Sequence, residues 1–219
     1  MPKRTKAEVV KLIHDCAVLY DNNLAEKNVI FATVHSNNIS VFETQFRARN
    51  YMHLTGVSSQ LNSNLFFRAA FNNRLSTNDI TLSPDGKTEL KLDVLPQLMN
   101  IHRLARMIGD YNSSRPLLVA DKFAGTVTMA LGFLRVNDLY IPNTALKLDV
   151  RDITRQATQH RIIAIFVKPR KDALYKQLSY MAKGITIDDN EIILNLSKKV
   201  DFKNLTATFP IPTKTSKNN

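Results

Sequence analysis

The sequence predicts an α+β fold: N-terminal helices and a hairpin, then a central antiparallel sheet of about four strands flanked by helices. Three observations support this prediction. Apolar residues recur at helical spacing in the first hundred positions, branched and aromatic residues concentrate after position 116, and turn-prone residues separate the runs. The 219 residues contain no internal repeat, so one domain is the simplest organisation.

Three segments are expected within this domain. Residues 1–40 supply an N-terminal helix and the first hairpin strand, packed on the core. Residues 41–185 form the main α+β unit, and residues 186–219 form a short C-terminal helix and a polar tail.

The first expected elements are a helix and a hairpin. Apolar residues spaced three and four apart predict an amphipathic helix over residues 6–25. Two β-rich runs, 28–35 and 39–46, flank the turn-prone "SNN" and predict a hairpin.

Two further helices are expected. One lies within 58–75, where a serine can cap it, and a loop over 75–89 follows. The other covers 95–111, with Pro96 tolerated in its first turn.

After position 116 the hydrophobic period changes. Residues 116–144 predict two or three strands, and 160–169 predict a further strand that Pro169 ends. A helix over 172–184 and a short one within 188–200 complete the expected elements.

The charge of the chain is positive and uneven. The formal net charge is +11, and it is concentrated in residues 151–183, which carry eight basic and two acidic side chains. Residues 76–100 carry two basic and four acidic ones. A concentration of this kind favours a surface that binds a polyanion, with a merely solvated basic surface as the alternative.

Several classes of protein lack their sequence signals here. The six glycines are scattered, so no phosphate-binding glycine loop is formed, and one cysteine with five dispersed histidines does not make a zinc motif. No carboxylate cluster for Mg²⁺ and no G-x-S-x-G elbow is present. No apolar run is long enough for a membrane span, and the lone Cys16 fits a reducing compartment, so we expect no metal, no cofactor and a cytoplasmic protein.

Metal-free chemistry on a phosphate remains. RNA carries its own nucleophile, the 2′-OH, so a protein need only move protons and neutralise the phosphate. Histidine suits the proton steps, and lysine or arginine suits the charge. Residues of these types lie on or beside predicted strand ends: His53, Lys122, Arg151 and Lys168.

Five blocks of sequence suggest a family. "YMHLTGV", "LPQLMNIHRLARMIGDY", "DKFAGTV", "YIPNTALKLDVRDIT" and "IIAIFVKP" follow one another across about residues 40–185. In this order they resemble the phage and mobile-element branch of the Barnase–EndoU–colicin–RelE-like nucleases. The resemblance implies two helices and a four-stranded antiparallel sheet that cleave RNA without a metal.

The resemblance also implies site residues. His53 would be an acid–base residue, oriented by Thr55, with Lys122 and Arg151 as phosphate ligands. Asn143 and Thr144, after Tyr140, would present polar groups at a strand end.

The identity of a second acid–base group stays open among His102, His160, Lys122 and Tyr140. Apart from this, His14, His35, His102 and His160 are expected to be structural. Substrate contacts are expected from Thr55, Tyr140, Asn143, Arg161 and Lys168, with Thr144 joining His53, Lys122 and Arg151 in the catalytic set.

These expectations lead to a hypothesis. The protein is a metal-independent endoribonuclease of a prophage or conjugative element that cuts RNA, and DNA as a second option, by 2′-OH attack to a cyclic phosphate. A non-catalytic nucleic-acid binder and a protein-interaction or inhibitor module are the alternatives. An antitoxin or immunity protein is a possible partner, and no membrane partner is expected.

Overall fold

The described chain opens with a capped helix, α1 (Lys6–Asn23). In this computed structural model the described residues are 4–36, 38–112, 118–187 and 190–209. The Thr5 side chain accepts a hydrogen bond from the Glu8 amide, and the Glu8 carboxylate accepts one from the Thr5 amide at 2.7 Å. This capping box fixes the first turn of α1.

The described elements follow in this order: α1, β1 (Lys27–His35), β2 (Asn38–Phe46), η1 (Ala48–Asn50), α2 (Tyr51–Thr55), β3 (Ser58–Ser59), α3 (Ser63–Phe71), η2 (Thr77–Asp79), β4 (Ile80–Thr81), α4 (Lys87–Leu98), α5 (Ile101–Leu104), β5 (Met107–Asp110), β6 (Lys122–Gly125), β7 (Ala130–Val136), β8 (Leu139–Leu146), α6 (Val150–Ile153), β9 (Gln159–Pro169), β10 (Gln177–Met181), α7 (Asn190–Leu196), η3 (Phe202–Asn204) and β11 (Thr206–Ala207).

Seven strands close into a barrel. The strand order is β1-β2-β8-β7-β6-β5-β9, and a second pairing joins β9 back to β1. Neighbours in the barrel are antiparallel except β2 and β8, which run parallel. β10 and β11 extend the sheet beyond β9, which gives nine strands in all.

The predicted fold class is therefore wrong. A sheet of about four antiparallel strands flanked by helices was expected, and the structure has a closed, mixed barrel with extra strands. The hairpin β1–β2 is part of the barrel, because β1 pairs with β9 along most of its length. Pairing both edges of β1 removes the open sheet edge that an isolated hairpin would leave.

Two predicted helices are also wrong. Residues 95–111 contain the end of α4, the short α5 and the strand β5, so Pro96 lies near the end of a helix that began at Lys87. Residues 172–184 contain β10, whose backbone pairs with β9. In both segments pairing with β9 outweighs a helical spacing of apolar residues.

Other predicted elements are confirmed. The first helix, the hairpin, the three strands after position 116, the strand β9 and the short helix within 188–200 are all present. The helix expected within 58–75 is the shorter α3. The polar tail from residue 210 lies outside the described residues.

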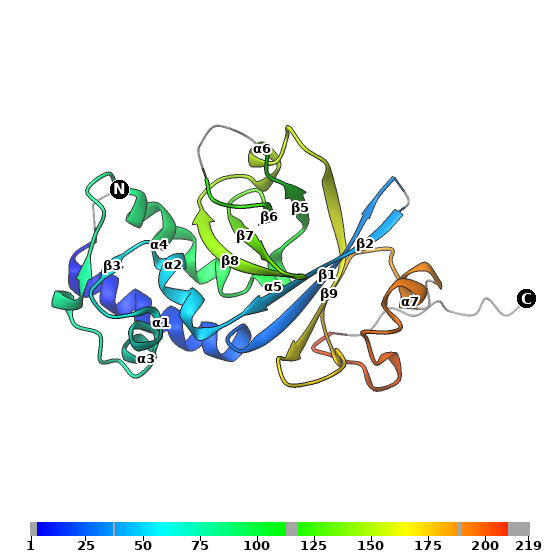
Figure 1. Cartoon of the computed structure of the whole chain (residues 1–219), viewed down its shortest axis with the longest axis horizontal. Coiled ribbons are helices and arrows are strands. Elements are labelled where there is room, and N and C mark those ends of the chain that lie inside the picture. Colours follow the sequence, from blue (N-terminus) through cyan, green and yellow to red (C-terminus); the bar gives the residue numbers. More distant parts are fainter. Residues whose placement is uncertain (1–3, 37, 113–117, 188–189, 210–219) are drawn as a thin grey trace, which may run out of the picture.

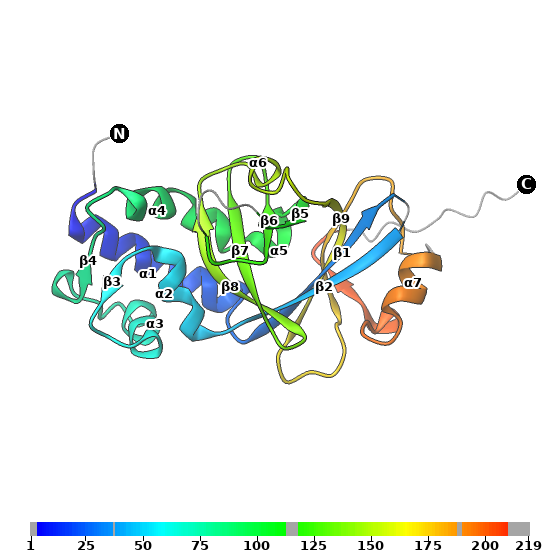
Figure 2. The same cartoon turned by 45° about the horizontal axis from the view of Figure 1, so that its top comes forward.

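The molecule has three parts along its length (Figure 1). Helices α1 to α4 gather at one end, the barrel is central, and α7 lies at the other side of the β1–β2 ribbon. The turned view shows the same arrangement (Figure 2). The main core is continuous from α1 (Val9, Ile13) through α2 (Leu54) into the barrel (Phe31, Phe133). The helices thus close one end of the barrel.

Candidate active site

Strand alternation decides which side chains of β1 point into the barrel. Val29 and Phe31 pack in the main core, whereas Ile30 and Ala32 belong to the outer cluster under α7. Thr33 and His35 continue the inward set toward the end of the strand. The interior face of β1 therefore changes from apolar to polar at the barrel end away from the helices.

β9 shows the same change. A bulge leaves Ile163 without a partner on β1, since Ala32 pairs with Ala164 and Thr33 with Ile162. Ile162 then packs inside the barrel and Ile163 outside it. His160, two residues before Ile162, faces the same interior, and the His35 and His160 ring centroids are 5.2 Å apart.

β5 and β6 add a charged pair to this open end. Ile108 and Ala124 are core residues, and Asp110 and Lys122 lie two positions from them toward the opening. The two are register partners, and Lys122 Nζ forms an ion pair with the Asp110 carboxylate. The lysine is thereby held over the barrel interior.

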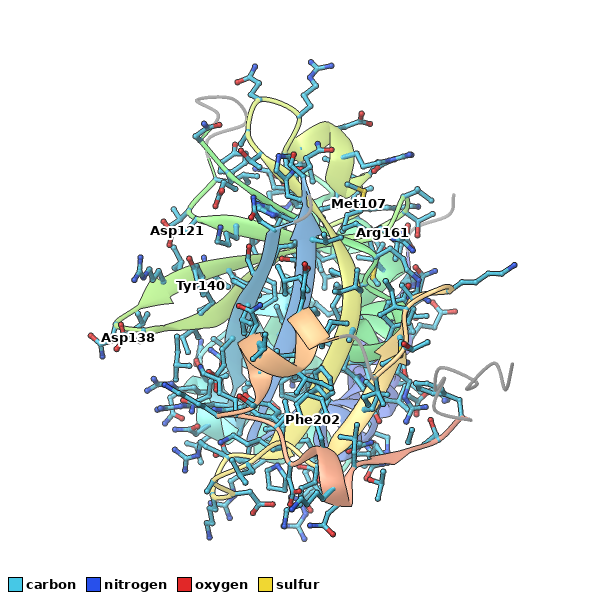
Figure 3. All side chains as sticks on the ribbon, turned by 90° about the vertical axis from the view of Figure 1, so that its right-hand side faces the viewer. Met107, Asp121, Asp138, Tyr140, Arg161 and Phe202 are labelled. Atoms are coloured by element: carbon cyan, nitrogen blue, oxygen red, sulfur yellow. The ribbon has the colours of Figure 1, made fainter. Side chains whose placement is uncertain are left out.

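An inner pocket of about 160 Å³ lies between these strands. The Tyr140 ring, 4.3 Å between centroids from Phe42, forms one side, and Lys122 Nζ is 5.9 Å from the Tyr140 centroid. Figure 3 shows Tyr140 beside β2, with Met107 and Arg161 on the other side of β1. The lining residues are Thr33, Ser40, Val41, Phe42, Ile108, Gly109, Lys122, Tyr140 and His160.

Burial and nearby cations act on His160. Burial, His35 and Lys122 together lower the pKa of His160, while Asp110 opposes them. Its buried Nδ1 has no hydrogen-bond partner within the described part of the chain. The ring lines the inner pocket, and a neutral imidazole at such a position is suited to accept a proton.

His35 is oriented from its other side. The carbonyl of Gln159 is 2.9 Å from His35 Nδ1, so Nδ1 carries the proton and donates it. A hydrogen bond of this kind fixes the tautomer and leaves Nε2 for chemistry.

A second, wider cavity adjoins the inner pocket; we call it the outer hollow. Its volume is about 790 Å³, and its lining residues are His35, Asp110, Asn112, Arg155, Gln156, Ala157, Thr158 and Gln159. The contact between His35 and His160 and the ion pair between Asp110 and Lys122 join the walls of the two cavities.

A barrel end that presents two imidazoles and a lysine carries groups suited to chemistry on a phosphodiester. The family model described as phage-Barnase-EndoU-ColicinE5/D-RelE like nuclease4 matches residues 12–184. The chain belongs to this nuclease family. The match confirms the resemblance noted from the sequence. No curated protein and no solved structure matches the chain.

Lys122 and Tyr140 are the predicted site residues that the nuclease brings together at the barrel opening. Thr144 and Arg161 lie elsewhere. Thr144 packs against Gly132 and Phe123 on the outside of the barrel wall. Arg161 is exposed, and because it follows His160 on β9 its side chain points out of the barrel where that of His160 points in.

Three further predicted residues are engaged locally. Arg151 of α6 is exposed and pairs with Asp149 at 2.6 Å. Asn143 Nδ2 donates to the Val119 carbonyl at 2.9 Å. Lys168 Nζ donates to the carbonyls of Asp172 and Ala173. Lys168 is eight residues from His160 on β9, which is about 26 Å at 3.3 Å per residue.

His53 and Thr55 belong to the helical end of the nuclease. His53 is exposed on α2 and lines a separate hollow with Arg49, Asn50, Asn62, Ser63 and Asn64. Thr55 is fully buried, and its hydroxyl donates to the Met52 carbonyl at 2.7 Å. The two cavities at the barrel opening do not include either residue.

Among the groups proposed as a second acid–base residue, His102 is buried on α5. Burial, Arg103 and Lys27 lower its pKa to about 3, and its Nε2 accepts a hydrogen bond from Arg103 Nε at 3.0 Å. His102 is thus a neutral interior residue at physiological pH.

Sequence reasoning assigned His35 a structural role and left His160 as one of four options. A signal was present in both strands: each histidine extends the inward alternation of buried residues, Val29 and Phe31 in one strand and Ile162 in the other. The bulge at Ile163 hides this alternation in β9, because it shifts the pattern by one residue.

The described residues contain no group of three or more histidine, cysteine, aspartate or glutamate side chains placed to hold a metal ion. Their helices include none with the length and hydropathy needed to cross a bilayer.

Proposed function

We propose that this nuclease is an endoribonuclease that needs no metal ion and cuts RNA at the open end of its barrel. The observation that carries the proposal is the pairing of His35 and His160, 5.2 Å apart, beside Lys122 at inward-facing positions. Two imidazoles supply one proton acceptor and one proton donor, and the lysine supplies the charge.

The reaction is an internal transfer of the phosphate. The 2′-oxygen of the RNA bonds to phosphorus as the bond from phosphorus to the 5′-oxygen breaks. The 2′-OH proton passes to the base, and the acid gives a proton to the departing 5′-oxygen. The products are a 2′,3′-cyclic phosphate and a 5′-OH end, so charge and protons balance without a co-reactant.

His160 is assigned as the base, because its environment favours the neutral imidazole. Burial, His35 and Lys122 all lower its pKa. His35 is assigned as the acid. Its Nδ1 donates a hydrogen bond to the Gln159 carbonyl, which fixes the orientation of the ring and leaves Nε2 for the substrate.

Lys122 is assigned to the phosphate. Its partner Asp110 holds the ammonium group at the opening, and a bound phosphate would share it. The Tyr140 ring beside Lys122 gives one wall against which a sugar or base can pack.

The test uses purified protein, RNA and EDTA, with an all-deoxy strand of the same sequence as a comparison. We expect cleavage of the RNA only, with cyclic phosphate ends. His160→Ala should reduce the rate by roughly 10²–10⁴-fold, the usual contribution of a positioned base.

The matched control is His53→Ala, an exposed histidine outside both cavities. It should cut at the rate of the unmodified protein and decides the prediction that His53 is catalytic. Thr144→Val and Arg151→Ala test in the same way the predictions that Thr144 and Arg151 are catalytic. Cleavage that survives His160→Ala and vanishes in His53→Ala would overturn the proposed site. Salt-sensitive binding without any cleavage would favour the non-catalytic binder.

A further inference from the structure

The outer hollow is five times larger than the inner pocket and lies beside the proposed acid. Building on the proposed function, we infer that the outer hollow binds the nucleotide on the 3′ side of the cut, whose 5′-oxygen departs. The nuclease would then select its cleavage sites by the base that follows the broken bond.

Continuity with the reaction centre is the first support. His35 and Asp110 line the outer hollow, and each contacts a residue of the inner pocket, His160 and Lys122 respectively. A phosphate beside Lys122 therefore has the outer hollow as the neighbouring cavity on the His35 side.

Direction along the RNA comes from the proton roles. The acid must approach the leaving 5′-oxygen, and the base must approach the 2′-OH on the other side of the phosphorus. His35 opens on the outer hollow and His160 on the inner pocket. The nucleoside attached to the leaving oxygen accordingly lies on the side of the outer hollow.

The side chains of the outer hollow suit a nucleotide. Asn112, Gln156 and Thr158 carry uncharged amide and hydroxyl groups that both donate and accept, as the edges of a base require. Arg155 adds a cation for the next phosphate or a planar surface for a base. The His35 imidazole is also a surface on which a base can stack.

The wall of the outer hollow is held in place at several points. Thr154 is buried against Gly109 of β5, where a β-carbon would lie 2.6 Å from the Thr154 Cβ. The Ala157 amide donates to the Thr154 carbonyl at 3.0 Å, and Gln159 Nε2 donates to the Arg151 carbonyl at 2.7 Å. A wall anchored in this way can present its side chains in a fixed geometry.

The experiment compares two substrates that differ only after the cut. One is a ribodinucleotide, and the other is the same first nucleoside as its 3′-(4-nitrophenyl phosphate) ester, which has no second nucleoside. Both form the same cyclic phosphate. Gln156→Ala and Thr158→Val should each slow cleavage of the dinucleotide by roughly tenfold, about the effect of one hydrogen bond. Their rates on the nitrophenyl ester should equal that of the unmodified protein.

A panel of four dinucleotides that differ only in the second base measures the preference for the base that follows the cut. The unmodified protein should prefer one second base, and Gln156→Ala should reduce that preference. Gln60→Ala, an exposed glutamine on the helical side, is the matched control and should leave both substrates unchanged.

Each result decides the inference. Equal losses of rate on both substrates would place these side chains on the 5′ side of the cut and would overturn the inference. An unchanged rate on both substrates would also overturn it. Cleavage of all four dinucleotides at equal rates would contradict the inference that the nuclease selects its sites by the base after the cut. Failure of the unmodified protein to cut either substrate contradicts the proposed function itself, so the two failures are distinguishable.

Discussion

The two ends of the barrel are built from the same strands and differ in what their interior positions carry. At the helical end these positions hold Val29, Phe46 and Leu131, which pack with α1 and α2. At the open end the continuing positions hold His35, Lys122 and His160. One end therefore supplies packing, and the other carries polar groups that contribute little to packing and that we assign to the reaction.

The largest effect is expected from a change at the helical end. Tyr51 is fully buried, and its hydroxyl donates to the Ile13 carbonyl at 2.6 Å. Tyr51→Ala should lower the free energy of unfolding by about 3–5 kcal/mol through the cavity that it leaves. Tyr51→Phe, which removes only the hydroxyl, should lower it by about 1 kcal/mol. Urea titration measures both, and equal losses would show that packing at this end is not what stabilises the fold.

A change at the open end should act on the reaction instead. Lys122→Met should reduce RNA cleavage about 100-fold, within the range found when a charge-stabilising group is removed. It should leave the urea midpoint within experimental error. Lys147→Met, which also removes a lysine from an aspartate pair, is the matched control and should retain full activity.

The same Lys122→Met variant has a second signature. The lysine lowers the pKa of His160, and Asp110, once unpaired, raises it. The acidic limb of the pH–rate profile should therefore move to higher pH, since the base must be deprotonated to act. A profile that keeps its position would contradict the assignment of His160 as the base.

The packing of Thr154 against β5, beside the open end, can be tested at Gly109. A β-carbon there would meet the Thr154 side chain at 2.6 Å, so Gly109→Ala should lower the free energy of unfolding by about 2 kcal/mol. Thr154→Gly in the same chain should recover part of this loss, and urea titration of both single variants and the double variant measures the coupling. Additive losses would show that the two residues do not contact.

The smallest effect at neutral pH is expected at His102, and acid should reveal it. Burial lowers its pKa to about 3, below the unfolded value of about 6.5. The unfolded state thus binds more protons between these values, and the stabilising contribution, complete above pH 6.5, is lost as the pH falls toward 3. His102→Gln should flatten the dependence of the free energy of unfolding on pH in this window, measured by urea titration at several pH values, and an unchanged dependence would contradict the assignment.

The sequence predicted local elements better than their assembly. Alternation and turn residues identified β1, β2, β7 and β9, because these signals are contained in each segment. The barrel depends on the pairing of β1 with β9, which lie more than 120 residues apart and carry no mark of one another. The segments of β5 and β10 have helical spacing and become strands because distant segments pair with them: β6 and β9 with β5, and β9 and β11 with β10.

The candidate site divides in the same way between residues that a local pattern marks and residues that only long-range pairing brings together. Lys122 and Tyr140 were selected for residue type and strand position, and both lie at the opening. His35 was expected to be structural, because nothing in its own segment marks it for another role. The role proposed for His35 depends on its contact with His160, and only the pairing of distant strands creates that contact.

The closure of the barrel has a consequence for biosynthesis. His35 and His160 are 125 positions apart, so a polypeptide still growing on the ribosome displays only one member of the couple until β9 has left the exit tunnel. Assembly of the couple then waits for a slow, long-range strand association. The two imidazoles therefore come together only after β9 has been synthesised and has paired with β1.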